Sequence, residues 1–205
     1  MNVPNILTMS RLVLVAIMMA LLTVAIPYAT SAALLVFAVA GITDWLDGHL
    51  ARKHNLITAF GRLMDPLTDK VMVCAAFVCF VEIQVAIPGG RSVSLVPAWI
   101  TVVIIAREFL VTGLRMLAAS RGNIISAGKW GKHKTVWQIV AIVILLLGVA
   151  VREDLLRHAG VKLLANYDFC FYYIARGVAM GVAVITVSSG LMYFIQHREL
   201  IAEGR

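Results

Sequence analysis

Apolar residues fall into six long runs along the 205-residue chain, and short polar or turn-forming stretches separate the runs. A helix needs about 20 residues to cross the hydrocarbon core of a bilayer, and each run approaches or reaches that length. No run shows the alternation of apolar and polar positions that is typical of a strand. The pattern predicts an all-α membrane protein with six transmembrane helices in a single domain, residues 1–205. The predicted helical runs lie near residues 6–26, 31–54, 61–87, 96–120, 134–152 and 169–195.

The breaks between the runs coincide with residues that favour turns. Pro27 follows the first run, Pro88 to Gly90 follow the third, and Gly122 lies just after the fourth. Residues 152–168 are polar, and we expect them to form a connection with a short interfacial helix. We expect the first run to be retained as a helix rather than removed as a signal peptide. No small-residue cleavage site follows it, and apolar runs continue along the chain.

The overall composition predicts that most of the surface faces lipid. Hydrophobic residues make up 61% of the chain and charged residues 14%, and the mean hydropathy is +0.91. Soluble domains are about 45–50% apolar and about 25% charged, so this chain is too apolar for a single aqueous core. Cys74, Cys79 and Cys170 lie in apolar runs without a CxxC pair, and we expect them to pack as small apolar side chains.

Positive charge is concentrated at the ends of the apolar runs. The formal net charge is +7, but the basic residues are not collected in one soluble patch, which argues against nucleic acid as a partner. With a cytoplasmic N-terminus, 13 of the 18 lysines and arginines fall on the cytoplasmic side. This bias predicts an integral protein of the bacterial cytoplasmic (inner) membrane, with both termini in the cytoplasm. A basic surface also favours anionic membrane lipids.

Four aspartates lie in the second and third runs at helical spacing. Asp44 and Asp47 are about 60° apart on a helix, and Asp65 and Asp69 are about 40° apart, so each pair shares one face. Ionisable groups within membrane spans are costly and usually mark function. We therefore expect two adjacent helices to present all four carboxylates to each other at the cytoplasmic end of the bundle.

Four negative charges in a poorly hydrated site need compensation, because like charges destabilise one another. Two divalent cations would balance four carboxylates in formal charge. Oxygen ligands of this kind favour Mg²⁺ or Mn²⁺ over zinc, and two such ions can clamp a phosphoryl group during displacement. The sequence thus predicts a two-metal site formed by Asp44, Asp47, Asp65 and Asp69.

Small residues accompany the aspartates on both predicted helices. Gly48 and Ala51 continue the face of the first aspartate pair, and Gly61 lies one turn before Asp65. Small side chains either let helices approach closely or leave room for a flat ligand against the backbone. Because these residues adjoin the carboxylates, we favour a ligand slot over helix packing alone.

Together these positions form the pattern D-x-x-D-G-x-x-A-R, eight further residues, then G-x-x-x-D-x-x-x-D, which runs from Asp44 to Asp69. The pattern resembles the signature of the CDP-alcohol phosphotransferase family, and the chain matches all eight of its fixed positions. The resemblance implies a six-helix membrane bundle, usually a homodimer. It also implies a CDP-linked lipid, CDP-diacylglycerol, as the donor substrate.

The same resemblance implies roles for individual residues. Asp44, Asp47 and Asp65 would bind metal, and Asp69 would be the general base that deprotonates the acceptor hydroxyl, close to a metal as well. The CDP-binding positions implied by the family pattern are Asp44, Gly48, Ala51, Arg52 and Gly61.

Cationic residues farther along the chain indicate the class of acceptor. Arg107 and Arg115 lie inside the fourth run, about 80° apart on a helix, and arginines at membrane depth need an anionic partner. Lys132, Lys134 and Thr135 open the fifth run, where cations and a hydroxyl at a helix N-terminus favour phosphate. We interpret these residues as a phosphate site for the acceptor. The simpler interpretations are ion pairing of the arginines and positive-inside anchoring by the lysines.

These two segments, and an N-terminal segment that contains Thr8, resemble the family members that use sn-glycerol 3-phosphate. The resemblance therefore implies transfer of a phosphatidyl group to sn-glycerol 3-phosphate, with Thr8 among the phosphate-binding residues. Inositol phosphate and phosphatidylglycerol remain alternative acceptors.

Two other classes of function would also place carboxylates in an apolar chain. A membrane cation transporter would carry acidic residues across the depth of the membrane, whereas the four aspartates here cluster near one side. A protein that only sequesters the CDP-linked lipid would need no base at Asp69.

Overall fold

A computed structural model describes the backbone of residues 3–24, 26–54, 59–87, 91–120, 129–157 and 161–196. Side chains are described for residues 9–24, 26–43, 67–68, 70–87, 91–120, 134–157 and 163–196. Within these residues the chain is mostly helical, with six α-helices, one short π-helix and one two-stranded hairpin.

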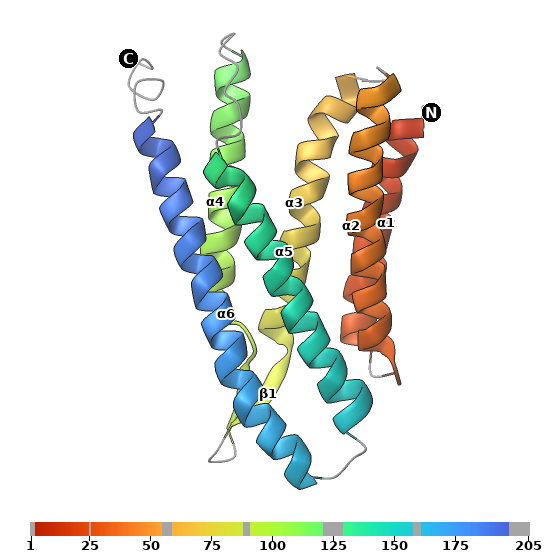
Figure 1. Cartoon of the computed structure of the whole chain (residues 1–205), viewed down its shortest axis with the longest axis vertical. Helices are drawn as coiled ribbons and strands as arrows, with labels where there is room; N and C mark the ends of the chain where they lie inside the picture. Colours follow the sequence, from red (N-terminus) through yellow and green to blue (C-terminus); the bar gives the residue numbers. More distant parts are fainter. Residues whose placement is uncertain are drawn as a thin grey trace.

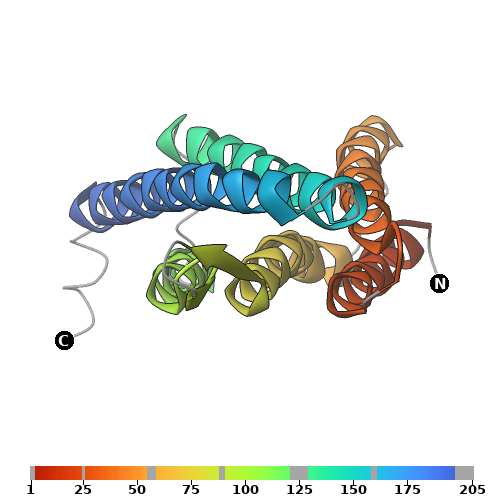
Figure 2. The ribbon, with the colours of Figure 1, turned by 90° about the horizontal axis from the view of Figure 1, so that it is seen from below.

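Six α-helices in the described residues run alternately up and down the long axis of the molecule (Figure 1). They are α1 (Val3–Thr23), α2 (Ala29–His54), α3 (Ala59–Glu82), α4 (Ala98–Ser120), α5 (Lys129–Ala150) and α6 (Val161–Gln196). Their contacts close a ring in the order α1, α2, α5, α6, α4, α3, and α3 also touches α5 across the ring (Figure 2). We call the end where α1, α3 and α5 begin the upper end, as it is drawn in Figure 1, and the opposite end the lower end.

The observed helices follow the six predicted runs, but several of their boundaries differ. Both α5 and α6 begin earlier than predicted, at Lys129 and Val161. The polar stretch after α5 contains the π-helix η1 (Val151–Leu156), where a short interfacial helix was expected. The hydrophobic pattern therefore located the helices but not their polar ends, because a helix continues through polar residues that lie beyond the apolar packing.

The structure contains one short hairpin that the predicted all-α pattern did not include. The third helix ends at Glu82, and the predicted run to residue 87 instead continues into β1 (Gln84–Ile87), which pairs antiparallel with β2 (Arg91–Ser94). The two residues after β2 fold back onto the end of α3: Leu95 N donates to Ile83 O at 2.8 Å, and Val96 N donates to Phe80 O at 3.2 Å. Strands of four residues are too short to show a reliable alternation in the sequence.

The centre of the bundle is apolar and closely packed. Phe77 and Phe80 are fully buried and meet edge to face, with ring centroids 6.0 Å apart. Where α5 and α6 meet, the rings of Tyr167 and Phe171 stack at 5.5 Å, and the Tyr167 hydroxyl donates a hydrogen bond of 2.8 Å to the carbonyl of Gly148. Glycine is needed at this contact, because a Cβ on Gly148 would overlap the Phe171 ring.

Polar contacts hold the lower end together. Asp154 in η1 accepts hydrogen bonds from the backbone N–H of Ser31 at 2.8 Å and from its hydroxyl at 2.5 Å. The Ser31 amide lies in the first turn of α2, where backbone donors have no partner within the helix, so Asp154 caps α2. Arg152 forms a two-pronged ion pair with Asp168 of α6, at 2.7 and 3.0 Å. Burial lowers the pKa of the Arg152 guanidinium, but its contacts with Asp168 and Glu153 outweigh burial and raise the pKa.

One helical stretch, Leu163–Gln196, is long and apolar enough to cross a membrane, among the residues whose side chains the structure describes. The helical stretches Met9–Thr23 and Ala29–Thr43 are also apolar but shorter. Large apolar side chains are exposed on all the helices whose outer faces are described, for example Leu35, Val102 and Leu191. The described surface thus exposes more large apolar side chains than is usual for a soluble protein.

Gly148→Ala is expected to destabilise the bundle by about 1–3 kcal/mol, because the added methyl group would force the Phe171 ring out of its place. The midpoint of thermal unfolding of the purified protein in detergent would measure this loss. Gly181→Ala is the matched control, since nothing lies within 4 Å of a Cβ at that position of α6. A midpoint for Gly148→Ala at or above that of Gly181→Ala would contradict the close contact.

Candidate functional site

The predicted aspartates lie on two helices that are consecutive in the chain, of which α2 ends and α3 begins at the upper end (Figure 1). Asp44 and Asp47 lie on α2, Asp65 and Asp69 lie on α3, and their side chains are outside the described residues. Asp44 is ten residues before the end of α2, and Asp69 is ten residues after the start of α3. At 1.5 Å per residue, both positions are about 15 Å from their helix ends. The backbone is therefore compatible with carboxylates at a common depth.

The link between these two helices is short. Four residues connect His54 to Ala59, and such a link can span at most about 18 Å. The predicted CDP-binding positions Gly48, Ala51 and Arg52 lie on the last turns of α2, and Gly61 lies on the first turn of α3. Their side chains, like those of Thr8 on α1 and Lys132 on α5, are outside the described residues.

Glu108 is the centre of a buried polar cluster between α4 and α5. Its Oε1 atom accepts hydrogen bonds from the ammonium group of Lys134 and, at 3.2 Å, from the side-chain amide of Gln138. All three side chains are buried. The guanidinium of Arg107, the neighbouring residue on α4, lies 3.8 Å from the same carboxylate oxygen. A buried charge needs such partners, so this cluster joins the two helices.

This arrangement refines the predicted phosphate site. Lys134 was expected to face a phosphate, and the structure places its ammonium group on Glu108 instead. Thr135 next to it is exposed. Glu108 also lies near Arg107, but its shortest contact is with Lys134. The arginines are therefore only weakly neutralised by this carboxylate.

Arg107 and Arg115 lie two turns apart on α4 and approach each other closely enough for electrostatic repulsion. In the described part of the chain, the Nε atoms of both side chains are buried and have no hydrogen-bond acceptor. Lys134 lies within electrostatic range of Arg107 and of Lys70 on α3. We call Arg107, Arg115, Lys134 and Glu108 the cationic cluster. These four side chains carry a formal excess of two positive charges.

The last helix contributes residues that the sequence analysis did not predict. The ring of Tyr193 lies under the guanidinium of Arg115, 5.4 Å from its Cζ atom to the ring centroid. Gly190, three residues earlier, faces the side chain of Arg107. The signal was present in the sequence, because Thr186, Ser189, Gly190 and Tyr193 follow a helical i, i+3, i+4, i+7 pattern within an apolar run.

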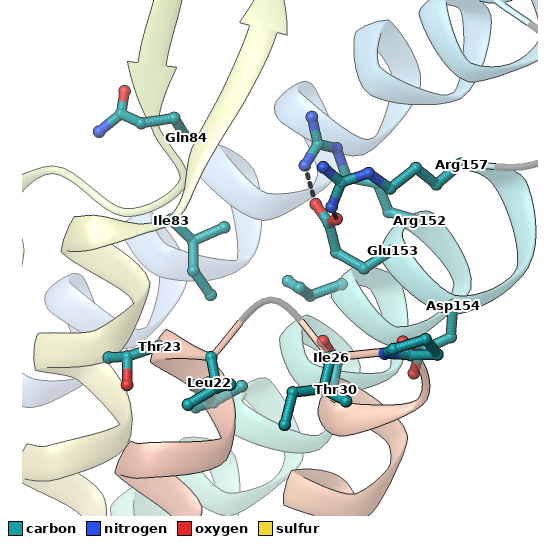
Figure 3. A pocket seen from close by; sticks show the side chains of 13 residues that line it. Leu22, Thr23, Ile26, Thr30, Ile83, Gln84, Arg152, Glu153, Asp154 and Arg157 are labelled. Carbon is teal, nitrogen blue, oxygen red and sulfur yellow. Dashed lines mark hydrogen bonds and ion pairs between the residues drawn. The ribbon is translucent and has the colours of Figure 1, made fainter.

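A cavity of about 360 Å³ lies at the lower end, away from these residues (Figure 3). It is bounded by the connection between α1 and α2, by Ile83 and Gln84, and by η1. Its charged side chains pair with one another, since Glu153 accepts hydrogen bonds from both Arg152 and Arg157. The charges of this cavity are internally balanced, so it is a weaker candidate for binding an anionic substrate than the cationic cluster.

The predicted donor set for a divalent cation is the four aspartates, whose side chains lie outside the described residues. Among the described side chains, no group of three or more histidine, cysteine, aspartate or glutamate residues is suited to hold a metal ion. The aspartates supply only oxygen ligands, which fit Mg²⁺ or Mn²⁺. Their placement on two helices joined by a short link is compatible with a shared site.

Comparisons with known proteins agree with the sequence pattern. A family model described as CDP-alcohol phosphatidyltransferase matches residues 1–188, which include the aspartates and the cationic cluster. The chain is 37% identical to a CDP-diacylglycerol–glycerol-3-phosphate 3-phosphatidyltransferase of Bacillus subtilis, over 98% of this chain and 97% of that protein. It is 40% identical to a protein of the same name from Pseudomonas fluorescens, over 71% of this chain and 72% of that protein.

A more distant relative carries a different name. The chain is 32% identical to a cardiolipin synthase (CMP-forming) of Oryza sativa subsp. japonica, over 90% of this chain and 56% of that protein. The family match covers most of the chain and includes every position of the aspartate pattern. The chain belongs to the CDP-alcohol phosphatidyltransferase family.

Proposed function

We propose that the chain transfers the phosphatidyl group of CDP-diacylglycerol to sn-glycerol 3-phosphate, with release of CMP. The names of the relatives from Bacillus subtilis and Pseudomonas fluorescens support this reaction. The structural observation that carries the acceptor assignment is the charge imbalance of the cationic cluster, where Arg107 and Arg115 are half-buried with buried Nε atoms, and the one carboxylate, Glu108, already binds Lys134.

The excess charge matches a phosphate monoester. Such a group carries about −1.5 to −2 charges near neutral pH, and the four side chains of the cluster have a formal excess of two positive charges. Arginine donors form strong, charge-assisted hydrogen bonds to phosphate. We therefore assign the acceptor phosphate to Arg107 and Arg115. The further phosphate-binding residues in this proposal are Thr8, Lys132, Lys134 and Thr135, of which Lys134 acts mainly by its charge.

The donor site is assigned to the aspartate helices. Two divalent ions, Mg²⁺ or Mn²⁺, held by Asp44, Asp47, Asp65 and Asp69, would neutralise charge on the pyrophosphate. Gly48, Ala51 and Gly61 leave room beside the backbone for the cytidine, with Arg52 nearby. The start of α5 and the end of α2 both belong to the upper end, so donor and acceptor can meet there.

The reaction needs one proton transfer and one displacement. Asp69 takes the proton from the 1-hydroxyl of sn-glycerol 3-phosphate, as a general base. The hydroxyl oxygen then forms a bond to the lipid-side phosphorus of CDP-diacylglycerol. The bond from that phosphorus to the bridging oxygen breaks, and CMP leaves with the electron pair. The arginines hold the acceptor phosphate so that its hydroxyl is aligned for attack.

We further propose that all six helices span the bacterial cytoplasmic membrane. The shortest, α1, has 21 residues and would be about 31 Å long, which matches a hydrocarbon core of about 30 Å. The distribution of lysines and arginines favours both termini and the upper end on the cytoplasmic side, where sn-glycerol 3-phosphate is dissolved. The lipid-facing helices would also form the surface for a homodimer.

The acceptor assignment is tested with purified protein, CDP-diacylglycerol and a panel of alcohols. We expect CMP release with sn-glycerol 3-phosphate and none above background with serine, inositol phosphate or phosphatidylglycerol. Release with phosphatidylglycerol alone would favour the activity in the name of the rice relative. CMP release with inositol phosphate alone would support the phosphate site but contradict sn-glycerol 3-phosphate as the acceptor.

Asp69→Asn is expected to lower turnover by at least about a hundredfold, because the amide cannot accept the proton of the acceptor hydroxyl. CMP release gives the rate, and binding of CDP-diacylglycerol is expected to survive because the other three aspartates remain. Asp154→Asn makes the same change at the lower end and should leave kcat close to that of the unmodified protein. Equal turnover of Asp69→Asn and the unmodified protein would exclude Asp69 as the base.

Arg115→Ala is expected to raise the KM for sn-glycerol 3-phosphate by about tenfold to a hundredfold, because it removes charge-assisted hydrogen bonds to the phosphate. The KM for CDP-diacylglycerol should change much less. Arg157→Ala is the control, since Arg157 is exposed and pairs with Glu153 at the lower end. Equal increases of both KM values in Arg115→Ala would count against the phosphate assignment.

A further inference from the structure

α6 lies against both arginines of the cationic cluster. The ring of Tyr193 contacts Arg115, and a Cβ on Gly190 would lie 3.1 Å from Cγ of Arg107. Gly190 and Tyr193 are three residues apart and therefore share one face of the helix. One face of α6, which we call the wall, thus contacts both Arg107 and Arg115, the two side chains to which we assign the acceptor phosphate.

The contact between Tyr193 and Arg115 differs in kind from the contact between Glu108 and Lys134. A carboxylate binds a cation through its N–H donors and cancels its charge. An aromatic ring attracts a guanidinium through its negative face, and the N–H donors in the guanidinium plane stay available. Tyr193 can therefore hold Arg115 in place without neutralising it.

Both partners of the contact between Tyr193 and Arg115 are at least partly shielded from water. Tyr193 is 8% exposed, so its ring is fixed by packing and excludes water from one side of Arg115. A cation–π contact is stronger when it is desolvated. The Nε atom of Arg115 is buried without a hydrogen-bond acceptor in the described part of the chain, so the side chain keeps unused donor capacity.

We propose that Tyr193 is a positioning residue for the acceptor: its ring holds the guanidinium of Arg115 in an orientation that leaves its charge and its donors for a phosphate monoester. Gly190 supports the same wall by leaving space for the side chain of Arg107. The inference rests on the proposed function, since it assumes that Arg115 binds the phosphate of the acceptor.

The test compares two substitutions of Tyr193 in the full-length protein. Tyr193→Leu removes the ring and is expected to raise the KM for sn-glycerol 3-phosphate by about threefold to thirtyfold. The KM for CDP-diacylglycerol and kcat should stay within about twofold. Tyr193→Phe keeps the ring face and should recover most of the lost affinity for the acceptor.

Two further variants separate this role from general packing. Tyr172→Leu removes a ring from another Tyr–Arg contact of α6, in which Arg176 lies 5.1 Å over Tyr172, away from the cluster. It should not change the KM for the acceptor. In an Arg115→Ala background, Tyr193→Leu should add little, because the two side chains act as one unit.

The possible results distinguish this inference from the proposed function. An unchanged acceptor KM in Tyr193→Leu overturns the inference, as does a defect in Tyr193→Phe equal to that in Tyr193→Leu. Additive effects of Tyr193→Leu and Arg115→Ala overturn it as well. If the unmodified protein uses another phosphate-bearing acceptor, the proposed acceptor is wrong and the same comparison is made with that molecule. Turnover only with an acceptor that lacks phosphate overturns both.

Discussion

The ion pair of Glu108 with Lys134 is the contact on which the upper end depends. Taking two charges out of water is costly, and two further contacts of the same carboxylate oxygen offset part of that cost. Gln138 donates a hydrogen bond to it, and the guanidinium of Arg107 lies 3.8 Å away. It links α4 to α5 across a ring whose other contacts are mostly apolar. Because the one carboxylate of the cluster pairs most closely with Lys134, the positive charge of the neighbouring arginines is left largely uncompensated within the cluster.

Charged side chains are paired differently at the two ends of the bundle. At the lower end, Arg152, Arg157, Glu153 and Asp168 pair with one another, and Asp154 caps α2. These contacts connect helices and leave little net charge for a ligand. At the upper end, cations are held by an aromatic ring and by one shared carboxylate. The same residue types therefore form balanced pairs at one end and leave an excess of positive charge at the other.

The sequence predicted the number of helices and the aspartate helices, since long apolar runs and fixed helical spacing are local properties of a chain. It missed the hairpin of Gln84–Ile87 and Arg91–Ser94, because four-residue strands carry too little periodicity. It also missed Tyr193 and the ion pair of Lys134 with Glu108, because both depend on how helices far apart in the sequence are placed in the bundle. The aspartate side chains stay predictions, since they lie outside the described residues.

The long helix α6 is held at two levels by two different elements. Near its middle, Arg176 donates a hydrogen bond of 3.1 Å to the carbonyl of Ser94 in the hairpin, and near its end Tyr193 meets Arg115 of α4. The two levels are about 25 Å apart along the helix axis. Together they fix the rotation of α6 about its own axis. Any change that twists α6 at the hairpin would therefore turn the tyrosine ring away from the guanidinium at the upper end.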